Sequence, residues 1–125
     1  MKRHRVTLVI LILVAAVVPS EVRGHAFPVR SEPRVGWTIP ASPATVRIWF
    51  DSEIEPEFSS LSVYNSANRR VDRTNARVDP SDGTLLQVDL PPLPPGAYRV
   101  YWKVLAKDTH VTEGDYSFIV GEKAP

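Results

Sequence analysis

The sequence YRVYWKVLAK, residues 98–107, alternates apolar and polar side chains more regularly than any other part of the chain. Successive side chains of an extended strand point to opposite faces of a sheet. One face of this segment would therefore carry Tyr98, Val100, Trp102, Val104 and Ala106. The stretch predicts a β-strand whose apolar face packs against a hydrophobic core.

Shorter segments on both sides have the same character. Strands are predicted at residues 45–50, 61–64, 85–90 and 116–120, with a weaker polar strand at 69–76. A turn is predicted at residues 81–83, where Gly83 would supply a positive φ. The segment PPLPPG, residues 91–96, cannot pair inside a sheet and is predicted to cross between two layers. Tyr98, two residues after Gly96, is placed like the tyrosine of the tyrosine corner in immunoglobulin-like domains. The predicted fold class is all-β: a small antiparallel immunoglobulin-like, cupredoxin-like Greek-key β-sandwich.

Composition narrows the possible chemistry. The chain has 125 residues and no cysteine, so one domain without disulfides, thiolate metal sites or thiol nucleophiles is expected. Its 12 prolines disfavour long helices, because proline lacks the amide donor that a helix needs. A formal net charge of +1 gives no reason to expect nucleic acid as a partner.

The N-terminal region has the pattern of a secretory signal peptide. A thirteen-residue apolar run, Val6 to Val18, follows the basic residues Lys2, Arg3 and Arg5. This run is too short to span a bilayer but fits the apolar region of a signal peptide. Cleavage is predicted between Gly24 and His25, which divides the chain into a signal peptide (1–24), a β-sandwich domain (25–121) and a short tail (122–125). The mature chain would carry 11 basic and 13 acidic side chains. We expect it to be periplasmic or extracellular, without stable membrane insertion.

A candidate metal site emerges when the register of the 98–107 strand is continued. It reaches Asp108 and His110, which would project to the same side about 7 Å apart if the chain stayed extended. After cleavage, the α-amine and ring Nδ1 of His25 could chelate a metal together. Three nitrogens and one oxygen favour Cu(II), and zinc is not excluded. Glu113 and Asp115 could accept hydrogen bonds from a ligating imidazole, although solvated loop charges are the simpler interpretation.

A family resemblance supports this interpretation. The chain resembles the CopC-like copper-binding family in copper resistance and homeostasis through His25-Ala26-Phe27, Ser31-Glu32-Pro33, residues 50–55, residues 96–104 and Asp108-Thr109-His110. The resemblance implies one Cu(II) per chain, bound by His25, Asp108 and His110, and often a CopD-type inner-membrane copper transport partner. Two features depart from some members of the family: the only methionine is Met1, where those members carry a methionine-rich stretch, and Thr109 stands where relatives frequently have glycine.

The predicted function is therefore a non-enzymatic copper carrier or buffer acting in copper resistance, uptake or homeostasis. The sequence contains no cysteine nucleophile and no glycine-rich phosphate loop. One alternative is a copper monooxygenase, because such enzymes also use an N-terminal histidine brace. Another is a metal-independent interaction module with Trp37, Trp49 and Tyr101 on one adhesive face, although tryptophans in alternating strands, such as Trp49 and Trp102, are more often core residues.

Overall fold

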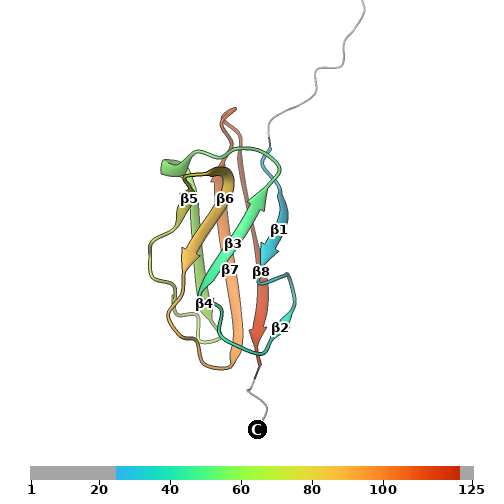
Figure 1. Ribbon diagram of the computed structural model, residues 1–125, viewed down its shortest axis with the longest axis vertical. Helices are drawn as coiled ribbons and strands as arrows, with labels where there is room; N and C mark the ends of the chain where they lie inside the picture. The colour runs from blue at the N-terminus through green and yellow to red at the C-terminus, as the bar shows by residue number, and fades with distance from the viewer. Residues whose placement is uncertain (1–24, 122–125) are drawn as a thin grey trace, which may run out of the picture.

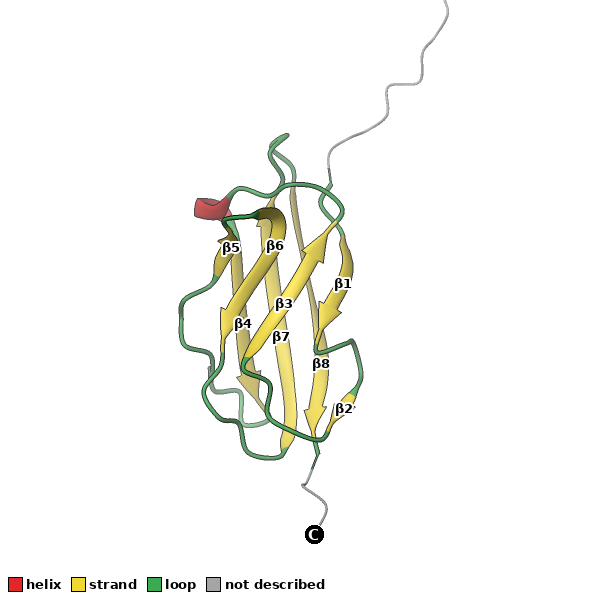
Figure 2. Ribbon diagram, in the orientation of Figure 1, coloured by secondary structure: helices red, strands yellow, loops and turns green. Residues whose placement is uncertain are grey.

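The computed structural model describes residues 25–121, which form two facing four-stranded sheets (Figure 1). The first sheet has the strand order β1 (Pro28–Glu32), β3 (Thr45–Phe50), β6 (Asp82–Asp89), β5 (Arg77–Asp79). The second has the order β2 (Thr38–Ile39), β8 (Val111–Val120), β7 (Gly96–Leu105), β4 (Ser60–Asn65). Apart from one 3-10 turn, η1 (Pro56–Phe58), the described chain is strand and loop (Figure 2).

The predicted all-β immunoglobulin-like sandwich is confirmed, with one departure. The strand pairs are antiparallel in both sheets of the described chain, except that the two-residue β2 runs parallel to the end of β8. No helix within residues 25–121 has the length and apolar character needed to cross a membrane. The predicted signal peptide (1–24) and tail (122–125) lie outside the described residues.

The core lies between the sheets, as the alternation in β7 predicted. Tyr98, Val100 and Val104 are buried on its inner face, whereas Arg99 and Lys103 are exposed on the outer face. The neighbouring strands contribute the same pattern, with buried Val46, Ile48 and Phe50 from β3 and Tyr116, Phe118 and Val120 from β8. Burial of these side chains, at about 1.5–3 kcal/mol for each large one, is the main force that joins the two sheets.

The proline-rich segment crosses between the layers as predicted. It connects β6 in the first sheet to β7 in the second. The Tyr98 hydroxyl donates a 2.5 Å hydrogen bond to the carbonyl oxygen of Pro94, four residues earlier. This bond ties the crossover to the strand that follows it, so the predicted tyrosine corner is confirmed.

The predicted polar strand at residues 69–76 is wrong. That segment makes one isolated bridge, Tyr64 to Arg70, and the strand β5 begins only at Arg77. Asp72 explains the difference, because its carboxylate accepts hydrogen bonds from the backbone N–H groups of Val63 and Thr74. Thr74 then adopts a positive φ of 57°, which a strand cannot accommodate.

The turn predicted at residues 81–83 begins one residue earlier and ends two residues earlier, at 80–81. Pro80 and Ser81 form the turn, with the N–H of Ser81 donating to the Asp79 side chain at 2.8 Å. Gly83 lies inside β6, where it is not needed for a positive φ. A Cβ added to it would come within 3.3 Å of the Glu53 side chain, which would have to shift by a few tenths of an ångström.

Candidate metal centre

Asp108 and His110 lie in the tight hairpin between β7 and β8. The N–H of Ala106 donates to the His110 carbonyl oxygen at 2.9 Å, and the N–H of Thr109 donates to the Ala106 carbonyl oxygen at 2.9 Å. The prediction that the β7 register continues extended through Asp108 to His110 is therefore wrong. The chain reverses here, before β8 begins at Val111.

Thr109 makes this reversal in a costly way. Its φ of 85° lies in the left-handed region, where a β-branched side chain is sterically disfavoured. The neighbouring Asp108 gives weak support, because its Oδ1 lies 3.5 Å from the His110 backbone nitrogen. The hairpin therefore carries local backbone strain at the residue between the two predicted ligands.

Replacing Thr109 by glycine should stabilise the protein. Glycine adopts a positive φ without strain, and its greater freedom in the unfolded chain offsets only part of that gain. We therefore expect the free energy of unfolding to increase by about 0.5–1 kcal/mol. For a domain of this size the unfolding midpoint would rise by roughly 2–8 °C, measured by circular dichroism. Thr109→Ala is the matched control, because it removes the branching but keeps the Cβ. A glycine variant no more stable than the alanine variant would contradict the strain argument.

The chain that leads from His25 into β1 is fixed at two points. Ala26 is fully buried, and its carbonyl oxygen accepts a 2.6 Å hydrogen bond from the Thr112 hydroxyl of β8. Phe27 exchanges two hydrogen bonds with Asp51: its N–H donates to Oδ1 at 2.9 Å, and its carbonyl oxygen accepts from the Asp51 N–H at 2.9 Å. These contacts hold His25 in place although it is itself exposed.

The two histidines consequently lie side by side. The ring centroids of His25 and His110 are 5.0 Å apart, with the rings tilted by 52°. The Asp108 Oδ1 lies 3.7 Å from the His110 Nδ1. The start of β1 and the β7–β8 hairpin meet at one end of the sandwich (Figure 1). All three residues predicted as ligands are thus gathered at this end, although they come from opposite ends of the domain sequence.

The side chains are gathered without being in ligating positions. Within residues 25–121, no three His, Asp or Glu side chains are already arranged to hold a metal ion. The His25 and His110 rings contact each other, and the α-amine of His25 exists only once the preceding peptide bond is cut. The His110 and Asp108 side chains are 54% and 37% exposed, so they have room to rotate.

Lys107 and Asp115, two charged residues near this hairpin, each form an ion pair. Lys107, next to Asp108, forms a 3.0 Å ion pair with Glu53, and this hydrogen bond raises the pKa of Lys107. Asp115 accepts a 2.7 Å hydrogen bond from Arg99 on the outer face of the second sheet. Glu113 lies opposite Lys103 on the same face. The solvated-charge interpretation of Glu113 and Asp115 therefore agrees with their position, and neither contacts His110.

Sequence reasoning missed the residues that fix the N-terminal segment. Thr112 reaches Ala26 across 86 positions of the sequence, and Asp51 reaches Phe27 across 24. A threonine in a strand and an aspartate after one are ordinary in any sandwich, so neither carried a recognisable signal. Only the pairing of distant strands shows that they hold the segment after His25.

The predicted aromatic adhesive face is not formed. Trp49 lies half-buried on the outer face of the first sheet under Arg30, so its predicted place in the core is wrong. Tyr101 is on the outer face of the second sheet, and Trp37 precedes β2. Trp102 does face inward but is only half-buried, at the edge where the sheets separate.

Comparisons with known proteins agree with this architecture. Residues 28–121 match the family model described as the CopC domain. The chain is similar to the copper transport protein CutJ of Bacillus subtilis, with 32% identity over 123 residues that cover 98% of this chain but only 23% of that longer protein.

Solved structures give the same match. The crystal structure of CopC from Methylosinus trichosporium OB3b superposes with a TM-score of 0.75 at 32% identity, covering 81% of this chain and 98% of that one. PcoC, a methionine-rich copper resistance protein from Escherichia coli, gives a TM-score of 0.65 at 27% identity, covering 77% and 98%.

Proposed function

This chain belongs to the CopC domain family, and from that premise we propose that it is an exported carrier that holds one Cu(II) ion as its cargo. The proposed ligands are the α-amine and ring of His25, the ring of His110 and the Asp108 carboxylate. The observation that carries the proposal is the 5.0 Å separation of the two imidazole centroids beside a backbone fixed at Ala26 and Phe27. The proposal includes cleavage after residue 24, leaving residues 25–121 as one copper-binding domain.

The proposed donor set suits the cupric ion. Three nitrogens and one carboxylate oxygen match the tetragonal environments that Cu(II) prefers. Soft sulfur donors suited to Cu(I) are scarce, because the chain has no cysteine and its only methionine is Met1. PcoC is by contrast described as methionine rich. We therefore propose a single Cu(II) site without a second site for Cu(I).

A carrier role fits this arrangement better than oxygen chemistry. Asp108, 3.7 Å from the His110 ring, is close enough to occupy a coordination position that an oxygen-activating copper would need to keep open. CutJ is a copper transport protein, and this chain matches only 23% of its length. We propose that this chain passes copper to a separate CopD-type membrane transport protein at the periplasmic or outer side of the inner membrane.

Copper titration of the exported protein tests this function. Mass spectrometry should find a chain beginning at His25 that takes up one Cu(II). His110→Ala should weaken binding by about 100-fold, because roughly 10–16 kcal/mol of metal binding shared among four ligands gives about 3 kcal/mol for each. Glu113→Gln is the control, since this exposed side chain does not contact His110, and its affinity should be unchanged. Unaltered binding in His110→Ala would refute the proposed site.

Thr112 should act as a positioning residue for His25. Thr112→Val keeps the shape of the side chain but removes the 2.6 Å hydrogen bond to Ala26, so the segment before β1 would move more freely. We expect Cu(II) affinity to fall by about 10-fold, in the range seen for residues that orient metal ligands. Thr112→Ser restores the hydroxyl and should restore the affinity. Equal losses in the valine and serine variants would assign the effect to packing instead.

A further inference from the structure

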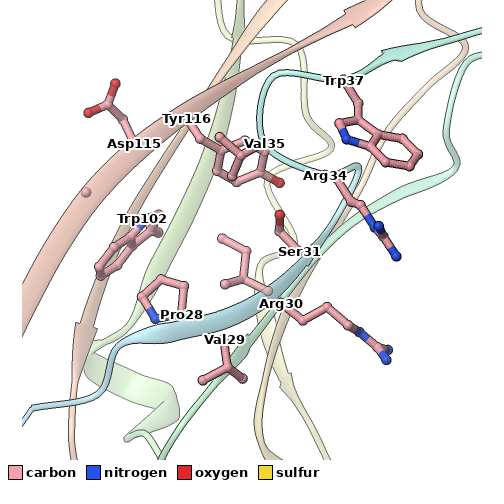
Figure 3. Close-up of a pocket in the computed structure, with 12 residues that line it drawn as sticks. Pro28, Val29, Arg30, Ser31, Arg34, Val35, Trp37, Trp102, Asp115 and Tyr116 are labelled. Carbon is pink, nitrogen blue, oxygen red and sulfur yellow. The ribbon is translucent and has the colours of Figure 1, made fainter.

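The two sheets separate along one side of the sandwich and leave a cavity between β1 and β8. Its volume is about 670 Å³, within the range of roughly 300–1,000 Å³ typical of small-molecule sites. Figure 3 shows Pro28 and Val29 from β1 on one side and Trp102 and Tyr116 from β7 and β8 on the other. The cavity is separate from the candidate metal centre, and the inference drawn from it does not rest on the proposed function.

The walls of the cavity are apolar and partly open to solvent. Val29, Val35 and Trp37 are 66%, 65% and 52% exposed, which is unusual for large apolar side chains gathered in one place. Trp102 forms the opposite wall, lying so close over Gly114 that a Cβ added there would be 2.5 Å from its ring. Burying these groups under an apolar ligand body would remove an exposed hydrophobic surface from water.

One polar group in the cavity lacks a partner. Tyr116 is 8% exposed, and within the described chain its buried hydroxyl makes no hydrogen bond. Figure 3 places this hydroxyl near that of Ser31. Burial raises the pKa of Tyr116. The Ser31 side chain, which lies close to the phenol but not in hydrogen-bonding geometry, lowers that pKa by a smaller amount, so the phenol stays protonated and can donate. A ligand oxygen that accepted this hydrogen bond would relieve the cost of burying an unpaired hydroxyl.

The cavity mouth is positively charged. Arg30 and Arg34 lie on the same side of it as Trp37 (Figure 3), and the Arg34 guanidinium is 4.7 Å from the Trp37 ring centroid. Arg30 lies over the Trp49 ring, 3.8 Å from its centroid, and makes a loose, exposed contact of 3.8 Å with Glu32. The one acidic residue that lines the cavity, Asp115, is already engaged by Arg99. Within residues 25–121 no acidic side chain pairs with Arg34, so its charge at the mouth favours an anion.

We propose that this cavity binds a small aromatic carboxylate that carries a second oxygen acceptor. The ring would lie against Trp37 and Trp102, and the carboxylate would meet Arg34 at the mouth. The second oxygen would accept the hydrogen bond from the Tyr116 hydroxyl. Each part of this ligand class answers one observed feature: the apolar walls, the cationic mouth and the unpaired phenol.

Calorimetric titration of the full exported protein with 4-hydroxycinnamate tests the proposal. We expect saturable binding with a Kd on the order of 10–100 μM, given the size of the ligand. Tyr116→Phe removes only the hydroxyl and should weaken binding by about 10-fold, and Arg34→Gln should do the same. Tyr101→Phe, on the outer face of the second sheet, is the matched control and should bind as the unaltered protein does. In nuclear magnetic resonance spectra, the indole signals of Trp37 and Trp102 should shift more than that of Trp49.

Charge preference and independence from copper give two further tests of this cavity. The neutral amide, 4-hydroxycinnamamide, should bind at least about 10-fold more weakly, because it lacks the charge that the arginines recognise. Copper uptake by the Tyr116→Phe and Arg34→Gln variants should be unchanged, which shows that they are folded and that the two sites are independent. Absence of saturable binding at about 1 mM ligand, well above the expected Kd, or equal affinity for the acid and its amide, would overturn the proposal.

Discussion

A form of the protein that begins at Ser20, with five residues before His25, is expected to bind Cu(II) about 1,000-fold more weakly than the form that begins at His25. In the longer form the His25 nitrogen belongs to a peptide bond, which has no free lone pair for a metal. One ligand is lost outright, and the chelate ring that fixes the His25 imidazole is opened. One ligand's share of about 3 kcal/mol gives roughly 100-fold, and opening the chelate ring supplies the remaining factor of about ten.

The fixed backbone makes the loss difficult to repair. The new terminal amine is five residues away, and each extended residue spans about 3.3–3.6 Å, while Ala26 and Phe27 remain bound to Thr112 and Asp51. Bringing that amine back to the metal would require closing a five-residue loop, which costs conformational entropy. A chelator competition assay on the two forms measures the difference.

Removing the extension after Gly24 provides the control, because it should restore full affinity. Combining the extension with His110→Ala should cost less than the sum of the two separate effects, since both changes act on the same bound ion. Comparable affinity in the long and short forms would show that the free amine of His25 is not a ligand. Strict additivity would show that His25 and His110 do not share one ion.

The strands were predictable where one face of the sheet is buried. Alternation in β7 predicted its inner face correctly, because the side chain period of a strand fixes which residues meet the core. The proline-rich segment before Tyr98 likewise predicted the crossover, because proline cannot pair inside a sheet. The Tyr98 phenol needs a hydrogen-bond partner, which it finds in the carbonyl oxygen of Pro94. Prediction failed at residues 69–76, where side chain contacts from Asp72 replace the ladder of strand hydrogen bonds.

The identity of the candidate ligands was easier to predict than their arrangement. His25, Asp108 and His110 are set apart by residue type and by position relative to the predicted cleavage point. Their arrangement depends on a hairpin turned by Thr109 at φ 85°, and few sequence rules place a β-branched residue there. The closeness of His25 to His110 also depends on the pairing of distant strands. The cavity lies along a separation of the two sheets, which no local pattern reports.

Asp72 should contribute more to stability than any exposed acidic residue of the chain. Its side chain is fully buried and accepts hydrogen bonds from the N–H groups of Val63 and Thr74, each at 2.8 Å. The Arg70 Nε donates to it at 2.9 Å. Burial raises the pKa of Asp72, but these three hydrogen bonds and the charge of Arg70 together hold it below its ordinary value.

Replacing Asp72 by alanine is therefore expected to lower the free energy of unfolding by about 3 kcal/mol. The change leaves the buried N–H of Val63 without an acceptor, which costs about 1–3 kcal/mol, and it releases the loop held at Thr74. The unfolding midpoint would fall by roughly 12–24 °C. Asp89→Ala is the matched control, because Asp89 also binds an arginine but does so at the surface. Its unfolding midpoint should change much less.

The same carboxylate should make stability depend on acid. Because the pKa of Asp72 is lower in the folded protein, the unfolded chain binds the proton more tightly, and folding stability falls as the carboxylate is protonated. Its contribution is complete above the ordinary value of about 3.9 and is lost as the pH falls through the lower, folded value. Urea unfolding between pH 6 and pH 2 should thus show a steeper loss of stability in the unaltered protein than in Asp72→Asn. Parallel pH profiles for the two proteins would mean that Asp72 does not remain charged in the folded state.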